Sequence, residues 1–121
     1  MIISHIPQAQ QGIDDAVERG LEMIGLTAEA YAKLELSTPK PHADGTMKPN
    51  IDTGRLLNSI SHITADDGLG LSAYIGTNVE YAPYVELGTS KMQAYPYLRP
   101  AVEKHIDEYK QILEAALKGT I

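Results

Sequence analysis

The sequence lacks several residue types on which many small proteins depend, and each absence excludes a class of structure. Its 121 residues include no Cys, which excludes both a disulfide framework and a thiolate metal site. Phe and Trp are absent while seven Tyr are present, so every large aromatic side chain is amphipathic. No apolar run approaches the ~20 residues of a membrane span. We therefore expect no membrane partner, and we regard any Tyr-rich surface as a candidate contact surface.

Positive charge is also in short supply. The formal net charge is -6 at pH 7 and the sequence pI is near 5.1. A polyanion is normally bound through a basic patch, which this sequence does not show, so specific nucleic-acid binding is disfavoured. Because the sequence has no Cys, the cytoplasm is the simplest compartment. The first seven residues are too short and too interrupted for a signal peptide, so we expect no export by that route.

Amphipathic periodicity predicts a long helix near each end of the chain. Apolar residues recur at steps of three and four between Gln10 and Leu34, and again from Leu98 to Leu117. Gly20 and Gly25 weaken the first of these helices. Either close packing against a neighbouring backbone or simple tolerance explains the two glycines, and close packing is the preferred interpretation. The first stripe consists of Ile13, Val17, Leu21, Ile24, Ala28 and Tyr31, and the second of Leu98, Val102, Ile106, Tyr109, Leu113 and Leu117.

The middle of the chain reads as a loop followed by a hairpin. Residues 37–53 contain three Pro and one Gly among polar residues, which predicts a long, mobile loop that orders when subunits assemble. Leu56–Thr64 and Leu69–Ile75 have the composition of strands, and the second has one apolar face. Asp66 and Asp67 precede Gly68 between them, where they read as turn residues rather than ligands, so the two strands are expected to form an antiparallel hairpin.

The remaining segments are short. Val79–Leu87 is compatible with a short helix or an irregular strand, and Thr89–Tyr95 with another short strand or sheet edge. The element order predicts an α+β fold in which two long helices pack on a small, mainly antiparallel sheet, with a long Pro-rich loop. Residues 1–121 are expected to form a single domain.

No residue pattern points firmly to catalysis or to a bound cofactor. The four histidines have none of the spacings typical of metal ligands, and no nucleotide-binding loop is present. Glu80 and Glu86, with His62, form the one acid–base combination to weigh. Solvated surface carboxylates explain these glutamates better, so we expect no enzyme, no cofactor and no metal. The histidines are His5, His42, His62 and His105.

Three ordered motifs carry the densest signal. They are DTGRLLNSI at Asp52–Ile60, GTNVEYAPYVELGT at Gly76–Thr89 and YPYLRP at Tyr95–Pro100. In this order they closely resemble the tail-component family typified by gene product ten of lambdoid phages. The resemblance runs from about Asp52 to the final helix, with a compatible helix ahead of it. Leu87 and Tyr97 stand where Phe is common in the family, a change that is expected to preserve apolar burial.

The resemblance implies a structural role at the neck of a tailed phage or prophage particle. Proteins of this kind look like tail-completion subunits that cap the tail tube and join it to the DNA-filled head, typically as a ring. The implied partners are copies of the chain itself, with a hexamer as one candidate ring, and other neck and tail-tube proteins. DNA would pass through such a ring without specific binding. The implied location is the virion neck or tail, and the host cytoplasm during assembly.

Two other functions stay open. One is a head-closure or minor capsid component at another neck position. The other is a small prophage-encoded enzyme that uses Glu80, Glu86 and His62.

The motifs nominate a set of interface residues. A closed ring needs two different, complementary patches on each copy. Tyr residues suit such patches, and an Arg can bond a Glu through both carboxylate oxygens, within a subunit or between subunits. The alternative is that the same side chains only fix the turns of the monomer. The residues are Arg55, Glu80, Tyr81, Tyr84, Glu86, Thr89 and Arg99.

Overall fold

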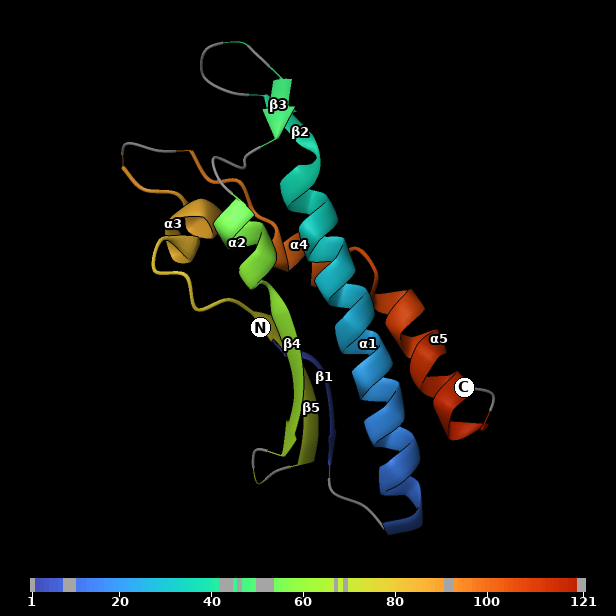
Figure 1. Cartoon of the computed structure of the whole chain (residues 1–121). Coiled ribbons are helices and arrows are strands. Elements are labelled where there is room, and N and C mark those ends of the chain that lie inside the picture. Colours follow the sequence, from blue (N-terminus) through green and yellow to red (C-terminus); the bar gives the residue numbers. More distant parts are fainter. Residues whose placement is uncertain are drawn as a thin grey trace.

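The computed structural model describes residues 2–7, 11–41, 45, 47–49, 54–66, 68, 70–90 and 93–119. Side chains are not described for residues 2–7, 11–14, 40–41 and 47–49. In chain order the elements are β1 (Ile2–Pro7), α1 (Gln11–Ser37), β2 (Pro39–Pro41), β3 (Met47–Pro49), α2 (Gly54–Ser59), β4 (Ser61–Asp66), β5 (Gly70–Gly76), α3 (Ala82–Leu87), α4 (Leu98–Glu103) and α5 (Ile106–Leu117) (Figure 1).

The main sheet has three strands in the order β1-β5-β4, with both neighbours antiparallel to β5. The predicted hairpin is therefore confirmed, as is the α+β class. Asp66 acts as a turn residue because its Oδ1 accepts a 2.9 Å hydrogen bond from the Gly68 N–H, and Gly68 has a φ of 91°. Asp67 lies outside the described residues. Both Ser72 and Ala73 are fully buried, so burial on β5 is wider than the single face predicted.

Helix α1 forms the centre of the molecule. It packs on β4 and β5 and also contacts α5 and α4, and Figure 1 shows it between the sheet and α5. Its predicted apolar stripe is confirmed where side chains are described, since Leu21 and Ile24 are at most 1% exposed. Burying one such side chain stabilises the fold by roughly 1.5–3 kcal/mol. The buried residues of α1 are Val17, Leu21, Ile24, Ala28, Ala32 and Leu36.

The two glycines of α1 lie at its closest contacts, as the close-packing interpretation predicts. A Cβ on Gly20 would lie 3.0 Å from the Ala116 Cβ of α5. A Cβ on Gly25 would lie 2.9 Å from the His62 ring of β4. The neighbours are mainly side chains rather than backbone, so these glycines let both layers approach the helix.

The predicted strand at Leu56–Thr64 is only partly correct. Its first residues form α2, and the strand β4 begins at Ser61. Leu56 and Ile60 are both buried while Asn58 is exposed, a four-residue spacing that fits one helical face and not strand alternation. Ser59 Oγ also donates a 2.7 Å hydrogen bond to the Leu56 carbonyl within this turn.

The predicted C-terminal helix is divided in two. Its apolar stripe is present, but α4 ends at Glu103 and α5 begins at Ile106. At the break, the His105 ring stacks on Tyr31 of α1 with centroids 3.5 Å apart. The Tyr109 hydroxyl donates to the Ala101 carbonyl and joins the two helices.

The long loop predicted at 37–53 is not confirmed. Pro39–Pro41 and Met47–Pro49 pair as a two-stranded antiparallel sheet. Prolines are tolerated in strands that lie at a sheet edge, which both strands of a pair do. Residues 42–44, 46 and 50–53 lie outside the described residues, so the predicted mobility stays a prediction.

Two further predictions differ from the structure. The N-terminal strand β1 was not predicted, because Pro7 and the short length hide its pattern. For Thr89–Tyr95, where a short strand or sheet edge was expected, the described residues show a single bridge at Thr89 and a 2.8 Å hydrogen bond from the Tyr95 N–H to the Val85 carbonyl. Among the described residues, no helix is both long and apolar enough to cross a bilayer.

Candidate docking surface

The stretch from Gly76 to Pro100 connects β5 to α4, and we call it the motif segment. Its central element is α3, which has Pro83 in its first turn, where the missing N–H costs nothing. Gly88 ends α3 with a φ of 76°, a conformation that favours glycine, and its N–H donates to the Tyr84 carbonyl at 2.8 Å. The sequence thus fixes both ends of this short helix.

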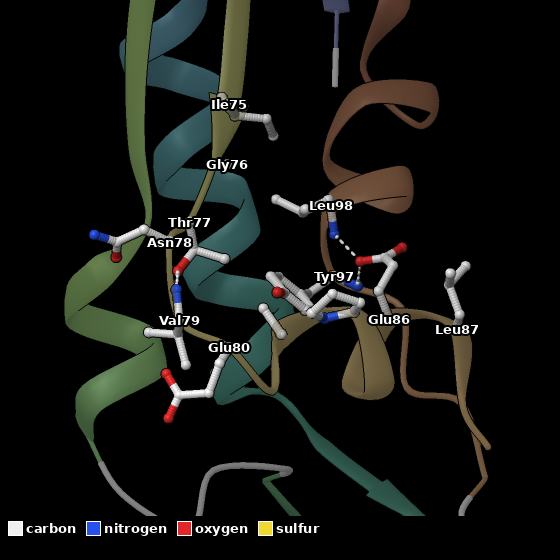
Figure 2. Close-up of a pocket in the computed structure, with 12 residues that line it drawn as sticks. Ile75, Gly76, Thr77, Asn78, Val79, Glu80, Glu86, Leu87, Tyr97 and Leu98 are labelled. Carbon is white, nitrogen blue, oxygen red and sulfur yellow. Dashed lines mark hydrogen bonds between the residues drawn. The ribbon is translucent and has the colours of Figure 1, made fainter.

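Glu86 connects α3 to the start of α4. Its Oε1 accepts hydrogen bonds from the N–H groups of Tyr97 at 3.0 Å and Leu98 at 2.8 Å, and its Oε2 accepts one from Arg99 at 3.3 Å. Figure 2 shows the Glu86 carboxylate turned toward the amides of Tyr97 and Leu98. The carboxylate satisfies N–H groups that a helix start leaves unpaired, and its charge suits the helix dipole. Glu86 therefore positions the motif segment.

Tyr97 anchors the motif segment in the core. It is 1% exposed, and its hydroxyl has no hydrogen-bond partner among the described residues. Burial, together with the Glu86 charge, raises the pKa of Tyr97 to about 12. The expectation that Tyr97 would preserve apolar burial in place of Phe is confirmed, although its hydroxyl is left unpaired.

Beside Tyr97 the surface is hollowed by an open cavity of about 480 Å³. The last residues of β5, the strand-to-helix connection, α3 and the start of α4 line it (Figure 2). The lining contains Val79, Ala82 and Leu98, so it is mainly apolar, with Glu80 and Glu86 as its acidic members. An open, mainly apolar cavity of this kind suits contact with another protein surface.

Arg55 of α2 bonds Glu80 through both carboxylate oxygens, with N–O distances of 2.9 and 2.8 Å. The Cζ atom of the Arg55 guanidinium lies 5.7 Å from the centre of the Tyr81 ring. The bond to Arg55 lowers the pKa of Glu80, and the Glu80 carboxylate raises the pKa of Arg55. Of the Arg–Glu combinations that the sequence left open, the structure shows the pair of Arg55 and Glu80 within one subunit. Its two side chains are 58% and 71% exposed, so it lies on the surface.

Tyr84 and Leu87 of α3 form an exposed apolar pair, which we call the α3 patch. Tyr84 is 56% exposed and Leu87 is 72% exposed. The expectation that Leu87 would be buried like Phe in the family is therefore wrong. Two exposed apolar side chains on one short helix, beside an apolar cavity, make a candidate contact surface.

The other two predicted residues are Arg99 and Thr89. The Arg99 guanidinium approaches Glu103 of its own helix at 3.8 Å, an exposed contact, while its backbone N–H bonds Glu86. Thr89 is exposed and follows Gly88 at the end of α3. The structure thus joins Arg55, Glu80 and Tyr81, leaves Tyr84 outward and gives Glu86 a positioning role.

Leu87 is the exposed apolar residue of α3 that sequence reasoning missed. The signal available was its place in the motif, directly before the glycine that ends α3. Thr77 was missed as well: its Oγ1 accepts a 3.1 Å bond from the Val79 N–H and contacts the Ser59 hydroxyl, which ties the motif segment to α2.

The acid–base combination considered from the sequence is not assembled. His62 lies between Glu22 and Glu29 of α1, with its Nε2 2.7 Å from Glu22 and its Nδ1 3.2 Å from Glu29. Glu80 is paired with Arg55 and Glu86 with backbone amides. Within the described part of the chain, no group of three acidic or histidine side chains is arranged to hold a metal ion.

Comparison with protein families identifies the chain. Residues 3–88 match the HK97-gp10-like family, described as "Bacteriophage HK97-gp10, putative tail-component". The chain belongs to this family. Comparisons with curated proteins and with solved structures found no match. The HK97-gp10-like chain is thus a structural phage protein of the tail-component type, and α2, β4, β5 and α3 all lie in the matched part.

Proposed function

We propose that this HK97-gp10-like chain forms a ring at the head-tail junction, where it completes the tail and joins it to the head. The observation that carries the proposal is the α3 patch. In a structural phage protein, a rigid helix that presents Tyr84 and Leu87 at 56% and 72% exposure provides an apolar contact for a second component.

The polar contacts of the motif segment support this role. Glu86 fixes α3 against the start of α4, and Gly88 fixes its end, so the patch does not have to be ordered on binding. A preorganised surface loses less conformational entropy on association. The net charge of -6 is compatible with a channel through which DNA passes without being bound.

A head-closure or minor capsid component at another neck position is the alternative within the same class. The two roles differ in what their loss does to packaged DNA. Without head closure, DNA escapes and the heads empty. Without tail completion, heads stay filled and tails accumulate beside them.

The test is complementation of a producing phage or prophage from which the gene has been deleted. Tyr84→Ala and Leu87→Ala should give folded subunits but filled heads and separate tails in electron micrographs. Arg99→Ala, which changes the exposed start of α4, should have the same direction of effect. Leu117→Ala is the matched control, because Leu117 is 51% exposed on α5, away from the motif segment.

Circular dichroism and thermal unfolding of each purified variant show whether the fold is retained. Unfolded Tyr84→Ala and Leu87→Ala variants would show that these residues serve only the monomer. Folded variants that join heads and tails normally would remove the α3 patch from the mechanism. Empty heads would favour the head-closure alternative, and antibody labelling away from the neck would overturn the placement.

A further inference from the structure

The main sheet ends in strand β4, which lacks the usual protection of an edge strand. Exposed edges are normally guarded by Lys, Pro or a β-bulge, because their unpaired backbone groups can bind another strand. Ser61–Asp66 contains neither Lys nor Pro. Its six residues pair with β5 in an uninterrupted register from Ser61–Gly76 to Asp66–Leu71. Among the described residues no strand pairs with the outer side of β4, so from Ser61 to Ala65 this side is a regular row of backbone donors and acceptors.

The exposed face of β4 also presents an apolar side chain. Ile63 is 61% exposed and pairs with Tyr74 in the register. Its neighbours His62 and Thr64 turn to the other face, where both contact Glu22 of α1. A strand added beside β4 would satisfy its backbone groups and cover Ile63.

The opposite edge of the same sheet is β1, whose register is irregular between Ile2 and Ser4 and which ends in Pro7, so its regular part for a further pairing is Ser4–Ile6. Because β1 and β4 are each antiparallel to β5, they run parallel to one another. Rotation about an axis along the strands preserves strand direction. A copy placed beside β4 by such a rotation therefore brings its own β1 to that edge, in parallel orientation. Pairing of β4 with another β4 through a two-fold axis would instead be antiparallel and would stop at a dimer.

Charge does not oppose this contact, although each copy carries a net charge of -6. The sequence of β1, Ile2–Pro7, contains no Asp, Glu, Lys or Arg. In β4 the formally charged residue is Asp66, at the very end of the strand. The two edges are thus places where acidic copies can meet with little repulsion.

We propose that copies of this chain join head to tail by parallel pairing of β4 in one copy with β1 of the next, so that the sheet continues around the ring. This inference rests on the ring in the proposed function. The two edges are different and complementary in direction, as a closing heterologous contact requires. The α3 patch then stays available for the other neck or tail components.

The test uses the absence of cysteine from the natural sequence. A double variant, Ile63→Cys with His5→Cys, adds one Cys to each edge strand. In the register, His5 pairs with Ser72 and Ser72 pairs with Ala65, which lies two residues from Ile63 on β4. Particles assembled from this variant are treated with a flexible bis-maleimide, which tolerates a small stagger between the strands. The mismatched control is Ile63→Cys with Leu117→Cys.

The expected result is a ladder of trimers and larger species on a denaturing gel for the matched pair, and no such ladder for the mismatched pair. Dimers as the largest product, with Ile63→Cys alone giving the same dimers, would indicate two-fold β4 pairing and overturn the proposal. No product above the single-variant background would overturn it as well. Crosslinks to a different phage protein instead would assign the edge to that protein.

A second variant separates this contact from the placement at the neck. Ile63→Lys adds an edge-guarding residue at an exposed position, so the subunit should fold but lose the ladder in the cysteine background. Leu117→Lys should keep it. The location of the chain is read independently by antibody labelling: a ladder from chain found outside the neck would support the pairing while refuting the head-tail placement.

Discussion

Helix α1 and the motif segment are built in opposite ways. Six side chains of α1 are at most 3% exposed, and apolar contacts with two layers surround it. The motif segment instead presents Tyr84 and Leu87 to solvent and relies on Glu86 for three backbone hydrogen bonds. Many apolar contacts keep α1 in place, whereas a few hydrogen bonds keep the α3 patch in place. Damage to the first should unfold the protein, and damage to the second should misplace the docking surface.

The largest expected effect comes from removing core volume in α1. Leu21 is fully buried, so Leu21→Ala should lower the free energy of unfolding by about 3 kcal/mol through lost burial and the cavity left behind. Urea denaturation of the purified chain measures it. Leu26→Ala is the control on the same helix, since Leu26 is 51% exposed and should change stability by about 0.5 kcal/mol or less. Equal midpoints for the two variants would show that α1 is not the stabilising core.

Loss of the Glu86 carboxylate should lower the overall stability less than Leu21→Ala does, but should disturb the start of α4 more. Glu86→Ala leaves the amides of Tyr97, Leu98 and Arg99 without their acceptor, which should cost about 2 kcal/mol. Hydrogen exchange of these amides should quicken while that of α1 changes little. Glu103→Ala is the control, because Glu103 has only an exposed 3.8 Å contact with Arg99. Uniform acceleration across the chain would contradict the separation of the two regions.

The same difference explains what the sequence could predict. Periodicity located α1, the β4–β5 hairpin and the C-terminal helical stripe, because burial repeats along those elements. It missed α2, where the buried Leu56 and Ile60 are too few to establish a period. It also missed the break at His105, where the ring stacks on Tyr31, a residue far away in the sequence.

The docking surface was predictable only as a list of residues. The motif marked Arg55, Glu80 and Glu86 together, but nothing in the spacing indicated which glutamate would meet the arginine. The pairing of Arg55 with Glu80 and the turning of Glu86 toward α4 follow from where α2 and α4 place their ends in space. The exposure of Leu87 likewise depends on which side of α3 faces the core.

The buried hydroxyl of Tyr97 gives a prediction of opposite sign, because its removal should stabilise the protein. Tyr97→Phe removes a buried polar group without a partner among the described residues and should stabilise the protein by about 1 kcal/mol. Tyr109→Phe is the matched control, because the Tyr109 hydroxyl donates to the Ala101 carbonyl, and its loss should destabilise by about 1 kcal/mol. Thermal unfolding of both variants measures the difference. Destabilisation by Tyr97→Phe would reveal a bond that the hydroxyl makes in solution.

The smallest expected effect concerns the contact between α1 and β4. Burial disfavours the charged form of His62, but its hydrogen bonds to Glu29 and Glu22 prevail and raise the pKa of His62 above its usual value. Both ring nitrogens face carboxylates, and only the protonated ring can donate to both. Lys33, 3.7 Å from Glu29, is the opposing positive charge in this group.

Because the pKa of His62 is higher in the folded state, protonation stabilises the fold. The stabilisation should be complete below the ordinary His pKa of about 6.5 and should disappear as the pH rises through the raised value. Thermal unfolding of the wild type should therefore show a midpoint that falls over this range relative to that of His62→Gln, whose amide does not titrate there. Parallel pH profiles for the two proteins would mean that the imidazolium contributes nothing to holding β4 on α1. Midpoints that converge as the pH rises would show that the packing of β4 on α1 depends on the charge of His62. This is the contact at which Gly25 lets the His62 ring approach the helix.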